Sequence, residues 1–390
     1  MKIEDLSTLN GIKPLKYPLS DTPHATIETN RTCNLQCRSC YNLNKDEMKS
    51  LSKVKEEIDL IVRKRNLQVI TLLGGEPTLH PKLPEIVNYV KSKGLLCQLL
   101  TNGIVFLQDD KDVLLEKLIQ EKLDKIIAHI DSGQKHFHKN IEIARGRLFS
   151  KLESKKICFS LSVTIYNDSK QMLGGFVKKY AKFRYFDGIL AVLARDPLPP
   201  KRQHASMEEE YVALSRDLRI EPAAYIPSIV DDKEVSWMIY LYFLNSGSGD
   251  AFGISPMQNR IFRKFYRLLK GHHFFIVTMN RSFVFCIFLL SILLEALLRP
   301  AKSGDLFRFL RTSLNPREIR LHYIALQNPP EYNEDTKELH LCCSCPDATI
   351  RNGKLTPVCI ADFVNPASRS YDRFFRSEYN QAAYAYLKEA

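Results

Sequence analysis

Residues 25–41 read ATIETNRTCNLQCRSCY, a short strand-like segment followed at once by three cysteines. Cys33, Cys37 and Cys40 have the spacing C-x3-C-x2-C. Three thiolates on one short loop can each hold one iron of a [4Fe–4S] cube, which leaves the fourth iron for a ligand that is not protein. A structural zinc site would need a fourth ligand, and none lies close by in the sequence.

Short apolar segments alternate with amphipathic ones through the first half of the chain. Six candidate strands begin near the following residues: Ala25, Val69, Leu96, Ile126, Ile157 and Gly188. Each interval between them can hold one helix, which is typical of βα units and a parallel sheet. Six units are too few to close an eight-stranded barrel, so we expect an α/β fold with a partial (β/α)6 TIM-like barrel. Its chemistry would lie at the carboxyl ends of the strands.

Three further turns fall where predicted strands end. Residues 72–78 read LLGGEPT, residues 100–103 read LTNG and residues 129–132 read HIDS. Gly74 and Gly75 have no Cβ, so their backbone can approach a ligand closely and their carbonyls can accept hydrogen bonds from an ammonium group. A parallel sheet would place all three turns on the same edge as the cysteine loop.

The cysteine spacing, the Gly-Gly-Glu turn and the LTNG turn together resemble the radical S-adenosylmethionine (radical SAM) superfamily over residues 22–200. One departure is Ser39, because the family usually has an aromatic residue before the last cysteine; Tyr41 could supply that ring. The resemblance implies that the three cysteines bind a [4Fe–4S] cluster whose open iron is chelated by SAM. It also implies that a wider set of residues contacts SAM: Gly74, Gly75, Glu76, Asn102, Asp131 and Ser132.

The resemblance implies a particular reaction. An electron donor such as flavodoxin or ferredoxin would reduce the cluster, and one electron would enter the sulfonium of SAM. The C–S bond would break to give methionine and a 5′-deoxyadenosyl radical, which removes a hydrogen atom from an unactivated carbon. The protein must therefore hold the open site and keep the radical away from water. The residues that act on the substrate stay unknown.

A second cysteine group lies near the end of the sequence. Residues 340–359 read HLCCSCPDATIRNGKLTPVC, in which Cys342, Cys345 and Cys359 have the spacing C-x2-C-x13-C. The Asn-Gly pair at 352–353 is a strong hairpin signal. Pairing outward from that turn sets Ile350 against Leu355 and brings Cys345 and Cys359 together.

The spacing of this second group resembles the C-terminal extension of the molybdenum-cofactor GTP-cyclising radical SAM enzymes, and more broadly the Twitch and SPASM auxiliary-cluster modules. By that resemblance Cys342, Cys345 and Cys359 hold a second [4Fe–4S] cluster. The sequence ends LKEA, without the Gly-Gly ending of the cyclase family, so we do not expect the cyclase itself. A zinc ribbon completed by His340 or Cys343 is the alternative, because ligand spacing alone does not choose between zinc and iron.

Residues 257–312 form a basic and hydrophobic block. The block has ten lysines and arginines against two acids, and residues 282–294 are 13 consecutive uncharged residues. This run is shorter than the roughly 20 residues of a spanning helix, and its basic flank is typical of a helix at an anionic membrane surface. A helical lid packed on the barrel is the second interpretation and nucleic-acid binding is the third. We expect no nucleic-acid partner, because the run is aliphatic and continuous.

Composition bounds the remaining expectations. The chain has 390 residues, of which 45% are apolar and 26% charged, and its net charge is +12. These are values of a globular protein with more than one packed unit. The N-terminus is mixed-charge, without the apolar segment of a signal peptide, so we expect a cytoplasmic protein that lies peripherally at the cytoplasmic membrane. Cys97, Cys158 and Cys286 lie in apolar runs and are interpreted as inert core or lipid-facing thiols.

We therefore divide the chain into six parts. They are an N-terminal segment (1–21), a radical SAM core (22–200), a connector (201–256), a basic hydrophobic helical insert (257–312), an auxiliary-cluster module (313–365) and a C-terminal helix (366–390). The predicted function is a radical SAM enzyme, an oxidoreductase or transferase, that acts on a lipid or membrane-associated substrate. The alternatives are a peptide-modifying maturase and a non-catalytic Fe–S or zinc-binding protein.

Overall fold

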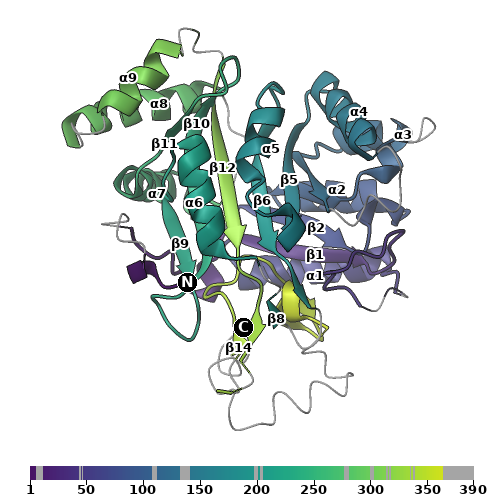
Figure 1. Ribbon diagram of the computed structural model, residues 1–390. Helices are drawn as coiled ribbons and strands as arrows, with labels where there is room; N and C mark the ends of the chain where they lie inside the picture. The colour runs from purple at the N-terminus through teal and green to yellow at the C-terminus, as the bar shows by residue number, and fades with distance from the viewer. Residues whose placement is uncertain are drawn as a thin grey trace.

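The computed structural model describes most of the chain. One large sheet lies at its centre (Figure 1). The described residues are 1–5, 12–43, 45, 47–107, 112–131, 141–196, 201–202, 205–275, 281–298, 303–312, 315, 318–333, 335–336 and 339–362. The predicted C-terminal helix at 366–390 lies outside these residues.

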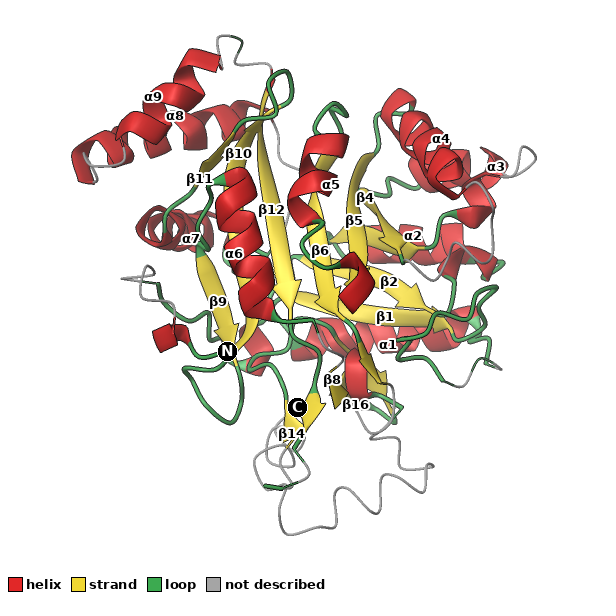
Figure 2. Ribbon diagram, in the orientation of Figure 1, coloured by secondary structure: helices red, strands yellow, loops and turns green. Residues whose placement is uncertain are grey.

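Six parallel strands follow one another in chain order. They are β1 (His24–Asn30), β2 (Val69–Gly74), β3 (Leu96–Thr101), β4 (Lys125–Ile130), β5 (Cys158–Ile165) and β6 (Phe186–Leu193). The helices between them are α1 (Leu51–Lys64), α2 (Leu83–Ser92), α3 (Asp112–Gln120), α4 (Ile141–Ser154) and α5 (Leu173–Tyr180). The predicted α/β fold and all six predicted strands are confirmed. The strand direction turns progressively from β1 to β6, as in part of a barrel wall (Figure 2).

Four more strands extend this sheet instead of further βα units. β12 (Ile319–Gln327) pairs parallel with β6 and antiparallel with β10 (Val235–Asn245). β9 (Ala224–Pro227) and β11 (Ala251–Gly253) pair with β10, which completes ten strands. The strand predicted around Trp237 is β10 and is confirmed. β12 falls in the range assigned to the auxiliary module, so this range contributes directly to the central sheet.

The two faces of β10 are covered by different helices. Tyr240 and Tyr242 belong to the same core as α6 (Met207–Leu218). Trp237, Leu241 and Phe243 pack in a second core with α8 (Arg281–Leu298) and α9 (Ser303–Thr312), and α7 (Pro256–Lys270) lies beside α8. The basic hydrophobic block therefore packs against the sheet, as the lid interpretation expects. Within the described ranges, no helix combines the length and the apolar character that crossing a bilayer requires.

A small hairpin at the C-terminal end of the described chain packs on β1. Its strands are β15 (Ala348–Arg351) and β16 (Lys354–Pro357), and the predicted pairing of Ile350 with Leu355 is confirmed. Two contacts between acidic and basic side chains join this hairpin region to β1: the ion pair of Arg351 with Glu28 at 2.6 Å and the approach of the Asp347 carboxylate to the His24 ring at 3.2 Å. Glu28 and His24 are buried, so these contacts fix the hairpin on the strand that leads into the cysteine loop. The remaining two-residue strands are β7 (Arg195–Asp196), β8 (Lys201–Arg202), β13 (Glu331–Tyr332) and β14 (Leu339–His340).

The carboxyl ends of β1 and β2 touch through their backbones. Gly75 N–H donates to the carbonyl of Asn30 at 2.9 Å, and Glu76 N–H donates to the carbonyl of Thr32 at 2.8 Å. A Cβ on Gly74 would lie 2.0 Å from the Asn30 oxygen, and one on Gly75 would lie 2.1 Å from the Thr32 oxygen. Gly74 also has φ +132°, a conformation that side chains rarely adopt. Both glycines are therefore required by the approach of the cysteine loop.

We predict that Gly75→Ala destabilises the protein by about 2–4 kcal/mol, because the new methyl group meets backbone atoms that cannot move independently. Gly175→Ala is the matched control, since Gly175 is exposed in α5 and a Cβ there would meet no atom within 4 Å. That change should stabilise by roughly 0.5–1 kcal/mol. Denaturant unfolding measures both values, and an equal effect of the two substitutions would contradict the close approach.

Candidate functional site

The carboxyl ends of the parallel strands surround a cavity of about 220 Å³. The predicted cluster ligands Cys33, Cys37 and Cys40 line it. The predicted SAM-contact residues that line it are Gly74, Gly75, Glu76, Asn102 and Asp131. Ser132 lies outside the described residues. One member of the second cysteine group, Cys359, also lines this cavity. The fold thus brings one cysteine of the second group to the cavity of the first group, which the sequence did not predict.

Polar contacts hold the first cysteine loop in place. Tyr41 donates its hydroxyl hydrogen to the carbonyl of Gly74 at 3.2 Å, and the Asn42 amide donates to the carbonyl of Arg31 at 2.7 Å. Lys45 Nζ donates to the carbonyl of Leu35 at 2.6 Å. These bonds tie both ends of the loop to β1 and β2, so the three thiols project from a fixed backbone.

Burial affects the thiols of this loop. It raises the pKa of Cys33, and it raises the pKa of Cys37 to about 12. Both groups are therefore protonated thiols at neutral pH when no metal is bound. Because a metal ligand must be a thiolate, metal binding at this loop releases protons.

Glu76 has a structural role that the sequence did not suggest. Its carboxylate is buried and accepts hydrogen bonds from the backbone and hydroxyl of Thr78 at 3.0 and 2.5 Å, from the Thr101 hydroxyl at 2.6 Å and from Asn102 N–H at 2.8 Å. These four donors join the turn after β2 to the turn after β3. Asn102 continues the connection, because its amide donates to the side-chain oxygen of Asn34 in the cysteine loop at 2.8 Å. Contact of Glu76 and Asn102 with SAM stays a prediction.

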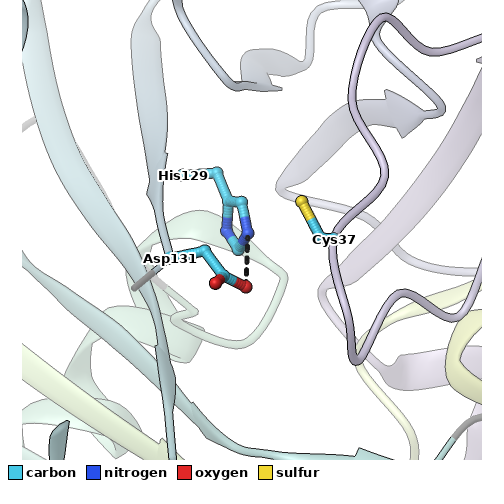
Figure 3. Close-up of side chains that lie close together, drawn as sticks. All are labelled: Cys37, His129 and Asp131. Carbon is cyan, nitrogen blue, oxygen red and sulfur yellow. Dashed lines mark ion pairs between the residues drawn. The ribbon is translucent and has the colours of Figure 1, made fainter. Parts of the chain in front are cut away.

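His129 and Asp131 from the end of β4 point toward Cys37 (Figure 3). The ligand atoms of these three residues lie within 4.8 Å of one another, and His129 Nε2 lies 3.9 Å from an Asp131 carboxylate oxygen. Asp131 accepts a hydrogen bond from the Tyr166 hydroxyl at 3.0 Å. Burial lowers the pKa of His129, so its ring is neutral at pH 7. Asp131 lines the cavity, so the turn after β4 lies on the same edge of the sheet as the cysteine loop, as expected.

Arg195 is a charged cavity residue that sequence reasoning missed. It follows β6, only 6% of it is exposed, and it donates a hydrogen bond to the carbonyl of Cys359. Burial lowers its pKa, whereas the thiols of Cys359 and Cys40 act to raise it. Arg195 thus contacts the second cysteine group at the cavity that the first group lines. No sequence pattern marks it, because it lies in a short segment before a proline.

Two backbone contacts and one left-handed residue assemble the second cysteine group. The segment at Cys342 forms a bridge with Ser228 next to β9, and Ser344 adopts φ 53°, which turns the chain back toward Cys345. Val358 N–H donates to the carbonyl of Asp347 at 2.8 Å, so the hairpin ladder continues toward Cys359. A hydrogen bond with the Cys342 thiol and burial raise the pKa of Cys345, and burial raises the pKa of Cys359 to about 12.

Among the described residues, one group of three metal-ligating side chains has its ligand atoms within 4.8 Å of one another: Cys37, His129 and Asp131. His340, which with Cys343 is a candidate fourth zinc ligand, is paired with Glu234 at 2.8 Å. A carboxylate partner of this kind is also usual for a metal-bound histidine. The choice between an iron–sulfur cluster and zinc at the second cysteine group therefore stays a prediction.

Two curated proteins illustrate the sequence similarity. Residues of this chain are 28% identical over 142 residues to the antilisterial bacteriocin subtilosin biosynthesis protein AlbA of Bacillus subtilis, covering 36% of this chain and 30% of AlbA. They are 33% identical over 127 residues to a probable GTP 3',8-cyclase of Methanococcus maripaludis, covering 28% of this chain and 43% of that protein. The chain thus spans less than half the length of both relatives.

Among solved structures, SuiB of Streptococcus suis bound to S-adenosylmethionine aligns with a TM-score of 0.39 and 15% identity, covering 52% of this chain and 46% of SuiB. The sequence also matches a family described as the Radical SAM superfamily over residues 27–154. That segment contains the cysteine loop, the Gly-Gly-Glu turn, part of β1 and all of β2 to β4. The chain therefore carries a radical SAM domain within residues 27–154.

Proposed function

We propose that this protein binds a [4Fe–4S] cluster through Cys33, Cys37 and Cys40 and uses it to cleave SAM reductively. The observation that supports this proposal is that the three thiols face one cavity together with the ends of β2, β3 and β4. Cys33, Cys37 and Cys40 would hold the cluster, and a cluster reduced by a one-electron donor would supply the electron that breaks a C–S bond of SAM. The chemistry that it supplies would end in removal of a hydrogen atom from the substrate.

The protein's own residues position and shield this chemistry. Glu76 fixes the turns after β2 and β3, so that the rim of the cavity does not depend on SAM for its shape. Part of the wall is apolar, and the side chains that form this part include Leu73, Leu100, Leu190 and Val192. Apolar walls exclude water, which protects a reactive intermediate from quenching.

We further propose that Cys342, Cys345 and Cys359 hold a second [4Fe–4S] cluster. Cys359 borders the cavity, and Arg195 donates a hydrogen bond to its carbonyl there. A buried cation is costly unless anionic charge compensates it. A thiolate at Cys359 would provide such charge, so the arginine favours occupation of the second site.

A lipid or membrane-associated molecule is the substrate class that we favour, because of the exposed surface of α7 and α8 described below. A peptide substrate is the second candidate, since one curated relative is named for bacteriocin biosynthesis. Substrates of the two classes can be distinguished by incubating the reduced protein and SAM with deuterated lipid or deuterated peptide. Deuterium in 5′-deoxyadenosine, measured by mass spectrometry, identifies the class that donates hydrogen.

Anaerobically reconstituted protein with dithionite should convert SAM to 5′-deoxyadenosine even without substrate. The triple substitution of Cys33, Cys37 and Cys40 by Ala should abolish product, because each thiolate holds one iron of the site that binds SAM. Cys286→Ala, an exposed cysteine on α8, is the control and should retain full activity. Product at the wild-type level in the triple variant would disprove the assignment.

The metal content tests the second site. Wild-type protein should contain about eight irons, and the triple Ala variant at Cys342, Cys345 and Cys359 should contain about four and still cleave SAM. Elemental analysis measures both. Four irons with one zinc in the wild type would establish a zinc ribbon instead. In that case Cys343→Ala or His340→Ala should release the zinc. If the wild type instead contains eight irons, neither substitution should lower the iron content by more than a small fraction.

Arg195→Gln should lower the reduction potential of a cluster next to it by tens of millivolts, on the order expected for removing a nearby positive charge. The sign follows because a cation stabilises the more negative, reduced cluster. Arg195→Lys retains the charge and should remain close to the wild-type potential. A redox titration followed by electron paramagnetic resonance measures the shift. Equal reduction potentials in all three proteins would show that Arg195 does not lie close to a cluster.

A further inference from the structure

The helix α8 exposes an apolar stripe that packing against the described residues does not cover. Leu289 and Leu290 are 45% exposed, Leu293 is 61% exposed and Leu297 is 76% exposed. These positions recur at the spacing of one helical face. The other face of α8 is already packed, because Ile287 and Ser291 are buried and Ile287 belongs to the second core. The stripe therefore faces away from the protein.

The neighbouring helix α7 also exposes both apolar and cationic groups. Phe265, Leu268 and Leu269 of α7 are among the most exposed large hydrophobic residues of the chain, and Gln258 of α7 donates a hydrogen bond to the Ser291 carbonyl of α8 at 3.0 Å. Figure 1 shows α7, α8 and α9 gathered on one side of the molecule. We call the exposed side chains of α7 and α8 the α7–α8 face.

Positive charge on this face is not neutralised within the described protein. Arg260, Lys264 and Lys270 are exposed, and α7 contains no acidic residue. No ion pair of these three cations is found among the described residues, whereas the neighbouring Arg267 pairs with Asp21 at 2.6 Å. A surface that combines exposed leucines with unpaired cations is complementary to an anionic and partly apolar partner.

We propose that the α7–α8 face docks the protein on an anionic phospholipid bilayer. An 18-residue helix such as α8 is about 27 Å long, less than the roughly 30 Å of a bilayer core. Its inward face is bound to the protein, so α8 lies along the bilayer surface with its leucines in the interfacial region. A second copy of the chain fits this face less well, because it would bring the cations of α7 against those of its partner.

Vesicle binding tests the docking independently of SAM chemistry, so its failure would leave the proposed reaction intact. Full-length protein should co-sediment with phosphatidylglycerol-containing vesicles at low salt and bind pure phosphatidylcholine vesicles much more weakly. Replacing Arg260, Lys264 and Lys270 by Gln should weaken partition into the anionic vesicles by roughly a hundredfold. Leu293→Asp with Leu297→Asp should weaken it by about tenfold or more. High salt should reduce binding without abolishing it, because apolar burial is not screened.

Matched controls separate this face from the rest of the surface. Val113→Asp on α3 and Val212→Asp on α6 place the same charge at exposed apolar positions elsewhere and should not change vesicle binding. All variants should cleave SAM at the wild-type rate. If wild-type protein does not bind anionic vesicles at low salt, the proposal is overturned. This holds whether the protein sediments as a monomer or as a dimer that Leu293→Asp disrupts. Equal losses in the control variants would overturn it as well.

Discussion

The site depends on one backbone contact, the approach of the β2 end to the beginning of the cysteine loop. Gly75 and Glu76 donate their N–H groups to the carbonyls of Asn30 and Thr32, and no side chain fits at the two glycines. This contact fixes where the loop leaves the sheet and therefore where its three thiols lie. Glu76, the next residue, extends the constraint to the β3 turn through its buried carboxylate. Glycine is thus needed here for contact between protein segments, whichever ligand binds.

The second cysteine group is coupled to the first through β1. The hairpin β15–β16 is fixed on this strand by pairs of charged residues, including the buried Glu28 with Arg351. Arg31, at the start of the cysteine loop, pairs with Asp362 at 2.5 Å. Breaking such a buried pair by removing one partner is expensive, about 3–5 kcal/mol. The positions of the two thiol groups are therefore linked by the same strand that carries the first loop.

The sequence left two interpretations of the helices α7 to α9 as alternatives, a packed lid and a membrane surface, and the structure is compatible with both. Their inner side belongs to the core that contains Phe243 of β10 and also Cys342 and Cys345, so they pack on the sheet as a lid would. Their outer side leaves leucines and cations in contact with solvent. A helix can bury one face in the protein and offer the other to a partner, because its two faces are independent. Lid packing and membrane docking are therefore compatible.

The sequence by itself determined the six parallel strands, the hairpin at Asn352-Gly353 and the two cysteine spacings, because periodicity, turn chemistry and ligand spacing are local properties. It also located the turns after β2, β3 and β4 that line the cavity. Only the tertiary structure decided that β12 lies between β6 and β10, since that pairing joins segments more than 70 residues apart and follows no local pattern. The tertiary structure likewise brought Cys359 and Arg195 into the cavity of the first cysteine loop. Charge compensation and burial depend on which distant segments meet, and they are therefore absent from any single stretch of sequence.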